Sequence, residues 1–211
     1  MASKIDICNR ALLKIGQPSI MSLDDNSQLA RLCLQEFDAA LEATLRSYPW
    51  PFAIKRAELA RQQDKPPFGP SFYYSLPSDS VRLVDVLTGG LPYQIEGTAI
   101  ATNASNVAVR YVSKNIPISA MDAQTKDVIA LMLATRLAIT VTENPQLKDM
   151  LYAETQQVLA QARNTAAVED YPQEPIEGVW LPSRVAGQGT SYFTSQFNPW
   201  GPDGSGVTSN D

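Results

Sequence analysis

The residues that could carry out chemistry are few, and their spacing favours structural roles. The chain of 211 residues contains no histidine, which excludes Ser-His-Asp and Cys-His catalysis of the usual kind and histidine-ligated zinc. Asp24 and Asp25 could bind a cation, but no calcium-loop pattern of oxygen ligands follows them. They precede a predicted helix, whose positive end favours acidic residues, so helix capping is the preferred interpretation. Glu36 and Asp38 lie within that helix and are interpreted as solvent-facing charges rather than as an acid–base pair.

The signals for phosphate binding are equally weak. Lys55, Arg56 and Arg61 could contact phosphates, but acidic residues interrupt this group. The glycine-rich segment 187–190 lacks the preceding strand and the following helix that a phosphate-binding loop requires. The sequence therefore predicts a protein that is not an enzyme and that uses no cofactor and no metal.

The two cysteines, Cys8 and Cys33, fall on the apolar faces of predicted helices. We predict that both are buried and reduced, as is usual for proteins made in the cytoplasm. A disulfide between the two helices is the alternative, without support in the sequence. The N-terminus lacks the apolar segment of a signal peptide. The sequence contains no run of about 18 apolar residues, so no membrane span is expected. We therefore expect synthesis in a cytoplasm.

Four helices are predicted from apolar residues that recur at helical spacing. Ser3 and Asp6 resemble a capping box for the first helix, and Gly16 suits its left-handed C-terminal cap. Asp25 or Asn26 is the candidate N-cap of the second helix. Asn144 and Pro145 separate the third helix from the fourth, with Pro145 in a first turn. The predicted helices cover residues 4–15, 27–48, 119–143 and 145–166.

Between the two helix pairs the apolar pattern changes to that of strands. Val81, Leu83, Asp85 and Leu87 are expected to share one side of a strand. Short strands with local turns predict a small antiparallel meander. The predicted strands cover residues 72–76, 81–87, 93–95, 98–102 and 107–112, after a linker at 62–70.

The predicted fold class is α+β. A four-helix bundle, formed by the N-terminal and C-terminal helix pairs, carries an inserted small antiparallel β domain and an extended C-terminal tail. The predicted domains are residues 1–61 for the first helix pair and its exit segment, 62–117 for the β domain, 118–169 for the second helix pair and 170–211 for the tail.

Two features of the helices are singled out for structural roles. Trp50 and Phe52 follow the second helix. This helix must end near Tyr48, because Pro49 and Pro51 disfavour helical geometry in the residues before them and remove backbone donors. We predict that both aromatics are buried and that they pin the exit of the helix. Arg136 lies in an otherwise apolar helix. It is either an exposed charge with its stem packed along the surface or part of an intersubunit or interdomain ion pair.

The tail after Asp170 is rich in proline and glycine and shows no helical period. It nevertheless carries many aromatic residues, whereas segments selected only for solubility are poor in them. We predict that these side chains are anchors that bind a partner chain. Folding back onto the same chain is the alternative. The predicted anchors are Tyr171, Trp180, Leu181, Tyr192, Phe193, Phe197 and Trp200.

Short motifs follow one another along the chain between residues 7 and 83. They are ICNRAL at 7–12, IG at 15–16, SLDD at 22–25, LRSYPWPFA at 45–53, YSLPSD at 74–79 and VRL at 81–83. This ordered set, over residues 5–162, resembles the tail tubular protein A family, the head-to-tail adaptors of short-tailed bacteriophages.

The resemblance implies a structural protein of the virion. In that family about twelve copies form a ring under the portal vertex. The ring continues the DNA channel, receives the tail nozzle protein and helps attach tail fibres or tailspikes. The implied partners are therefore the portal protein, the nozzle and a fibre or tailspike, and the tail anchors would bind the portal or the neighbouring subunit.

The net charge is compatible with a channel that DNA passes without sequence-specific binding. Each chain carries a net charge of −5, which amounts to about −60 for a ring and would not trap phosphates. Two alternatives remain: a head-completion or stopper protein of another tailed phage, and a non-viral protein-interaction module.

Overall fold

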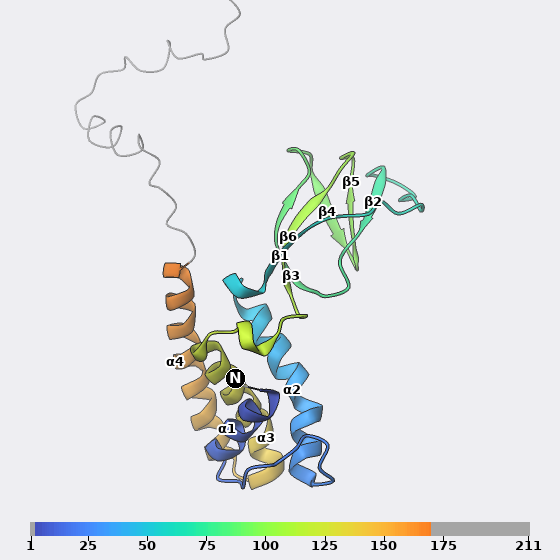
Figure 1. The fold of residues 1–211 in the computed structure, drawn as a ribbon. Helices are drawn as coiled ribbons and strands as arrows, with labels where there is room; N and C mark the ends of the chain where they lie inside the picture. The colour runs from blue at the N-terminus through green and yellow to red at the C-terminus, as the bar shows by residue number, and fades with distance from the viewer. Residues whose placement is uncertain (1–2, 170–211) are drawn as a thin grey trace, which may run out of the picture. The chain divides into compact units, whose positions relative to one another are not determined.

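The computed structural model describes residues 3–169 (Figure 1). This part of the chain is α+β, with four helices and two small antiparallel sheets. The helices are α1 (Lys4–Lys14), α2 (Gln28–Ser47), α3 (Ala123–Thr142) and α4 (Pro145–Glu169). The strands are β1 (Ile54–Glu58), β2 (Phe72–Ser75), β3 (Ser80–Leu87), β4 (Tyr93–Glu96), β5 (Ala99–Thr102) and β6 (Ala108–Ser113). Two short 3₁₀ turns, η1 (Pro51–Ala53) and η2 (Ile118–Ala120), precede β1 and α3.

The ends of α1 and α4 follow the local sequence as predicted. The Ser3 hydroxyl accepts a hydrogen bond from the Asp6 backbone, and the Ser3 N–H donates to the Asp6 carboxylate at 2.7 Å, which completes the capping box. Gly16 follows α1 with φ +72°, a conformation that glycine adopts without the cost of a Cβ. Pro145 opens α4. No helix among residues 3–169 has both the length and the apolar character needed to cross a membrane.

Two predicted helix starts are wrong. The N-cap of α2 is Ser27, whose hydroxyl accepts from the Ala30 backbone at 3.1 Å. Asp25 instead accepts from the Ser22 N–H in the preceding turn, at 2.9 Å. The third helix begins at Ala123 rather than near residue 119, because Asp122 caps it and η2 occupies the residues before.

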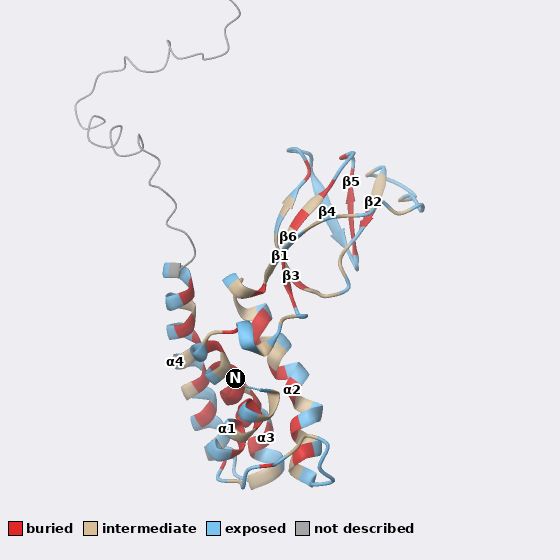
Figure 2. Ribbon diagram, in the orientation of Figure 1, coloured by how far each residue is buried: buried red, intermediate tan, exposed pale blue. Residues whose placement is uncertain are grey.

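Helix α3 is the common partner of the other three helices. It packs against α1, α2 and α4, and ten of its 20 residues are buried, including the consecutive run 128–131. A helix that is apolar on all sides requires such surroundings, and Figure 2 shows the buried residues facing inward on all four helices. The principal core cluster contains Phe37, Leu133 and Leu151. Cys8 and Cys33 are buried and free in the same cluster, as predicted.

The strands form two three-stranded sheets rather than one meander. The strand orders are β1-β6-β3 and β2-β5-β4, and every pair is antiparallel. Only β4 and β5 are consecutive neighbours, so the predicted antiparallel character is confirmed and the predicted meander is wrong. An additional strand, β1, lies in the segment assigned to the helix exit and pairs with β6 from Ile54↔Val112 to Glu58↔Ala108.

Irregularities in β3 overturn the predicted alternation along this strand. The pairing with β6 shifts register between Leu83 and Asp85. Leu83 and Val86 therefore pack on the same core cluster, which also contains Tyr74. Asp85 and Leu87 are exposed. A one-residue shift exchanges the two faces of a strand.

Candidate partner-binding surfaces

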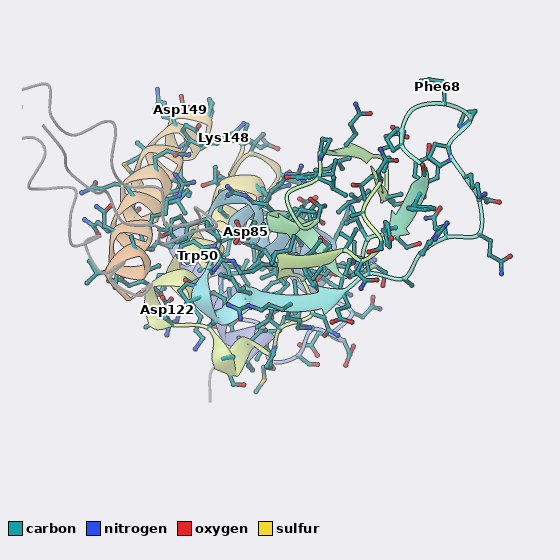
Figure 3. The ribbon with its side chains drawn as sticks, turned by 90° about the horizontal axis from the view of Figure 1, so that it is seen from above. Trp50, Phe68, Asp85, Asp122, Lys148 and Asp149 are labelled. Carbon is teal, nitrogen blue, oxygen red and sulfur yellow. The ribbon has the colours of Figure 1, made fainter. Side chains whose placement is uncertain are left out.

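The exit of α2 is a buried junction between helices and sheet. Trp50 is 0% exposed and packs in a cluster with Leu45 of α2, Val112 of β6, Val128 of α3 and Ala162 of α4. Figure 3 shows Trp50 among the side chains where these elements meet. This residue therefore holds the first strand segment against both helix pairs.

Aromatic contacts and one hydrogen bond fix the orientation of Trp50. Its indole N–H donates to the Thr44 carbonyl at 2.9 Å. The Tyr48 ring meets it edge-on at 5.3 Å, and the Phe52 ring stacks on it at 6.1 Å with an interplanar angle of 22°. Phe52 is only partly buried, and the segment Pro51–Ala53 forms a 3₁₀ turn. The turn keeps the two rings on the same side.

Arg136 lies on the surface between α3 and α2. Its side chain is 39% exposed, and Nη1 lies 3.3 Å from Oε2 of Glu36, whose side chain is 31% exposed. The pair joins the first and second helix pairs of one chain, beside a groove of about 430 Å³ that Lys148 also lines. A second ion pair, from Lys4 to Asp38 at 3.1 Å, joins α1 to α2. Glu36 and Asp38 of α2 therefore each connect this helix to another one.

The turn before β3 is held by Asp79. Its carboxylate accepts hydrogen bonds from the Ser113 hydroxyl at 2.7 Å, the Tyr111 hydroxyl at 3.1 Å and the Lys55 ammonium at 3.2 Å. The Ser113 hydrogen bond, aided by Lys55 and Tyr111, lowers the pKa of Asp79. Burial and the neighbouring carboxylate raise the pKa of Tyr111. Asp79 thus ties the turn at 76–79 to β6 and β1, a structural role for this motif.

A groove of about 690 Å³ lies between this turn, β3, the β4–β5 hairpin and the C-terminal end of α2. We call it the β3 groove. Its charged residues are Arg46 and Arg82, both exposed, and no acidic residue lines it. Arg46 donates to the Val81 carbonyl at 3.3 Å, and Arg82 donates to the Arg46 carbonyl at 3.4 Å. The lining is completed by Ser75, Leu76, Pro77, Ser78, Ser80, Val81, Leu83, Ile95, Gly97 and Thr98.

Large apolar side chains are exposed beside this groove and on the neighbouring loops. Strand β4 is an edge strand, and all four of its residues are exposed; Figure 2 draws it pale blue. Phe68, 86% exposed, lies at the tip of the loop before β2, where Figure 3 labels it. We interpreted this loop only as a linker, although an aromatic residue among prolines and glycine was a signal for a contact. The exposed apolar residues of the β part are Phe68, Leu87, Leu91, Tyr93 and Ile95.

The predicted tail anchors, from Tyr171 to Trp200, lie outside the described residues. Within residues 3–169 no three His, Cys, Asp or Glu side chains come together as ligands for a metal. The surfaces that the structure brings together are apolar and basic, a chemistry that suits the binding of a polypeptide. No protein-family model and no curated protein sequence matches the chain. The function is therefore inferred from these surfaces and from the motif order.

Proposed function

We propose that this chain is the structural head-to-tail adaptor of a short-tailed phage. About twelve copies would form a ring that joins the portal vertex to the tail nozzle, lines the DNA channel and helps attach fibres or tailspikes. The finer description of the fold belongs to the same proposal: the four helices form a bundle, the β domain is inserted into it, and the tail extends from it.

The observation that carries the proposal is the set of exposed apolar side chains on the β part. Tyr93 and Ile95, on edge strand β4, are 43% and 55% exposed, and Phe68 is 86% exposed on the loop before β2, the other edge strand of the same sheet. Exposed apolar side chains at a sheet edge favour association with another chain. A subunit of a closed ring needs two different surfaces that bind each other side to side. The β part offers one such surface.

The remaining features suit a ring that DNA passes. The net charge of −5 per chain disfavours retention of phosphates. The aromatic residues of the tail supply anchors for the portal or the neighbouring subunit, and an extended segment needs several anchors because docking costs conformational entropy.

The test is a mixture of the full chain with its neighbouring portal protein. Negative-stain images should show a cyclic assembly, and mass measurement should give one adaptor per portal subunit. One adaptor per portal ring would contradict the proposal. A head-completion or stopper protein would occupy a different ring position, and an interaction module would remain small.

Two sets of variants locate the contacts. Tyr93→Ser with Ile95→Ser should weaken ring formation, whereas Leu13→Ser on α1, at a residue that is 76% exposed, should leave it unchanged. Truncation after Asp170 should leave the thermal stability nearly unchanged and should sharply reduce portal binding. Full portal binding by the truncated chain would refute the anchor assignment.

A further inference from the structure

We propose that the β3 groove binds residues 170–181 of a neighbouring copy of this chain. The inference rests on the proposed function, because the neighbouring copy is the adjacent subunit of the ring. It assigns the first part of the tail to the adaptor itself and leaves the distal aromatics, from Tyr192 to Trp200, for the portal.

The charges of the groove and of the segment are complementary. Arg46 and Arg82 line the groove, and neither takes part in any of the six ion pairs among residues 3–169. Of the acidic residues that flank the lining in sequence, Asp79 is paired with Lys55 at 3.2 Å, and Glu96 keeps its charge and accepts a hydrogen bond from the Tyr73 hydroxyl. The charges that line the groove itself are both positive. The segment 170–181 carries the acids Asp170, Glu174 and Glu177 and no basic residue.

The apolar surfaces also match. Leu76, Val81 and Ile95 contribute apolar lining, and Ile95 is 55% exposed without an occupant. The segment supplies Tyr171, Ile176, Val179, Trp180 and Leu181. Aromatic side chains in a groove are the usual anchors of a bound peptide.

Backbone geometry favours an extended occupant. β3 is an edge strand in the order β1-β6-β3, and an edge strand offers free backbone groups to an added strand. Residues 176–181 contain no proline, so each can donate a backbone hydrogen bond. A segment of twelve residues spans at most about 40 Å when extended, which sets how far from the end of α4 the groove of the neighbouring copy can lie.

The test is site-specific photo-crosslinking in the full chain. A benzophenone amino acid replaces Ile95, whose exposure makes the change tolerable. Trypsin then releases residue 95 in the peptide 83–110 and the segment in the peptide 164–184. We expect a crosslink between these two peptides. The same amino acid at Met21, which is 92% exposed, is the control and should not yield it.

Isotope labelling identifies which copy provides the segment. The crosslinker variant is unlabelled and is mixed with an excess of ¹⁵N-labelled wild-type chain. A light 83–110 peptide joined to a heavy 164–184 peptide is the expected product. Light–light products alone would show docking within one chain and would overturn the assignment to a neighbour. The absence of any crosslink to 164–184 would refute the β3 groove as the binding site of this segment.

Charge reversal tests the recognition. Glu174→Arg with Glu177→Arg should lower the yield of crosslinked dimer about five- to tenfold, and Arg46→Glu with Arg82→Glu in the groove should restore it. The yield in these variants is measured as covalent dimer on a denaturing gel, because Glu177→Arg adds a trypsin site within 164–184 and Arg82→Glu removes the site before residue 83. If the groove variant (Arg46→Glu with Arg82→Glu) does not fold, the tail variant (Glu174→Arg with Glu177→Arg) tests the charge argument by itself. An unchanged yield in the tail variant would overturn the charge argument. Ring formation with the portal but no crosslink would refute only this inference, whereas a crosslink between copies without a ring would refute only the proposed function.

Discussion

Replacement of Trp50 by alanine should destabilise the chain more than any surface change. Trp50 is completely buried at the junction of α2, α3, α4 and β6. Removal of its side chain leaves a cavity. The surrounding helices and strand cannot move inward to fill this cavity, because each also packs against other elements. Removal of a buried tryptophan or phenylalanine costs about 3–5 kcal/mol.

The hydrogen bond adds little to this cost. The Thr44 carbonyl that accepts from the Trp50 indole at 2.9 Å also accepts from the Ser47 hydroxyl at 2.6 Å. The carbonyl therefore keeps a partner when the indole is removed, and no buried acceptor is left unsatisfied. Trp50→Phe, which retains most of the apolar contact, should cost about 1–2 kcal/mol.

Thermal unfolding of the full chain, followed by far-ultraviolet circular dichroism, measures both effects. For a domain of this size 1 kcal/mol lowers Tm by about 2–4 °C. Trp50→Ala should therefore lower Tm by about 6–20 °C. Phe68→Ala is the matched control, because this aromatic residue is 86% exposed and should change stability by less than about 0.5 kcal/mol. Equal melting temperatures for Trp50→Ala and wild type would refute the junction.

Three further predictions concern titratable groups. The Ser113 hydrogen bond lowers the pKa of Asp79 in the folded protein. The ionised Asp79 therefore stabilises the folded state fully above the unfolded pKa of about 3.9, and this stabilisation is lost as pH falls through the folded pKa. Asp79→Asn should cost about 1–3 kcal/mol at neutral pH and less in acid; urea unfolding at both pH values checks this, and an equal cost would contradict it. Cys8 and Cys33 are both buried, and the hydrogen bond to Cys33 and burial raise the pKa of Cys8. Because burial denies a thiol reagent access to either sulfur, the reagent should label neither cysteine in the native protein and both in denaturant, as counted by mass spectrometry. Arg136→Ala breaks a partly exposed ion pair and should lower stability by less than about 1 kcal/mol in the same melting assay.

The parts of the fold that depend on neighbouring residues could be predicted from the sequence. The capping box at Ser3 and Asp6, the glycine after α1 and Pro145 at the start of α4 each involve residues within one turn. The apolar period of α1, α2 and α3 also identified the buried faces, including Cys8 on α1 and Cys33 on α2. The α2 cap was misplaced by two positions or fewer, since Asp25, Asn26 and Ser27 are all good capping residues.

Strand pairing could not be predicted in the same way. β1 reads Ile-Lys-Arg-Ala-Glu, with three charged residues, and becomes a strand because β6 pairs with it. The bulge in β3 also depends on that partner. Edge strands and register shifts arise from contacts between distant segments, to which local preference contributes little.

The same distinction applies to the candidate sites. The amino-acid sequence by itself determined the α+β class, the burial of Trp50 at the end of a helix that prolines must stop, and the aromatic content of the tail. These properties follow from side-chain chemistry and from spacing within a few residues. The β3 groove was decided only by tertiary structure. Arg46, Arg82 and Ile95 come from a helix end, an edge strand and a hairpin, and only the packing of these elements brings two positive charges and an apolar wall to one surface.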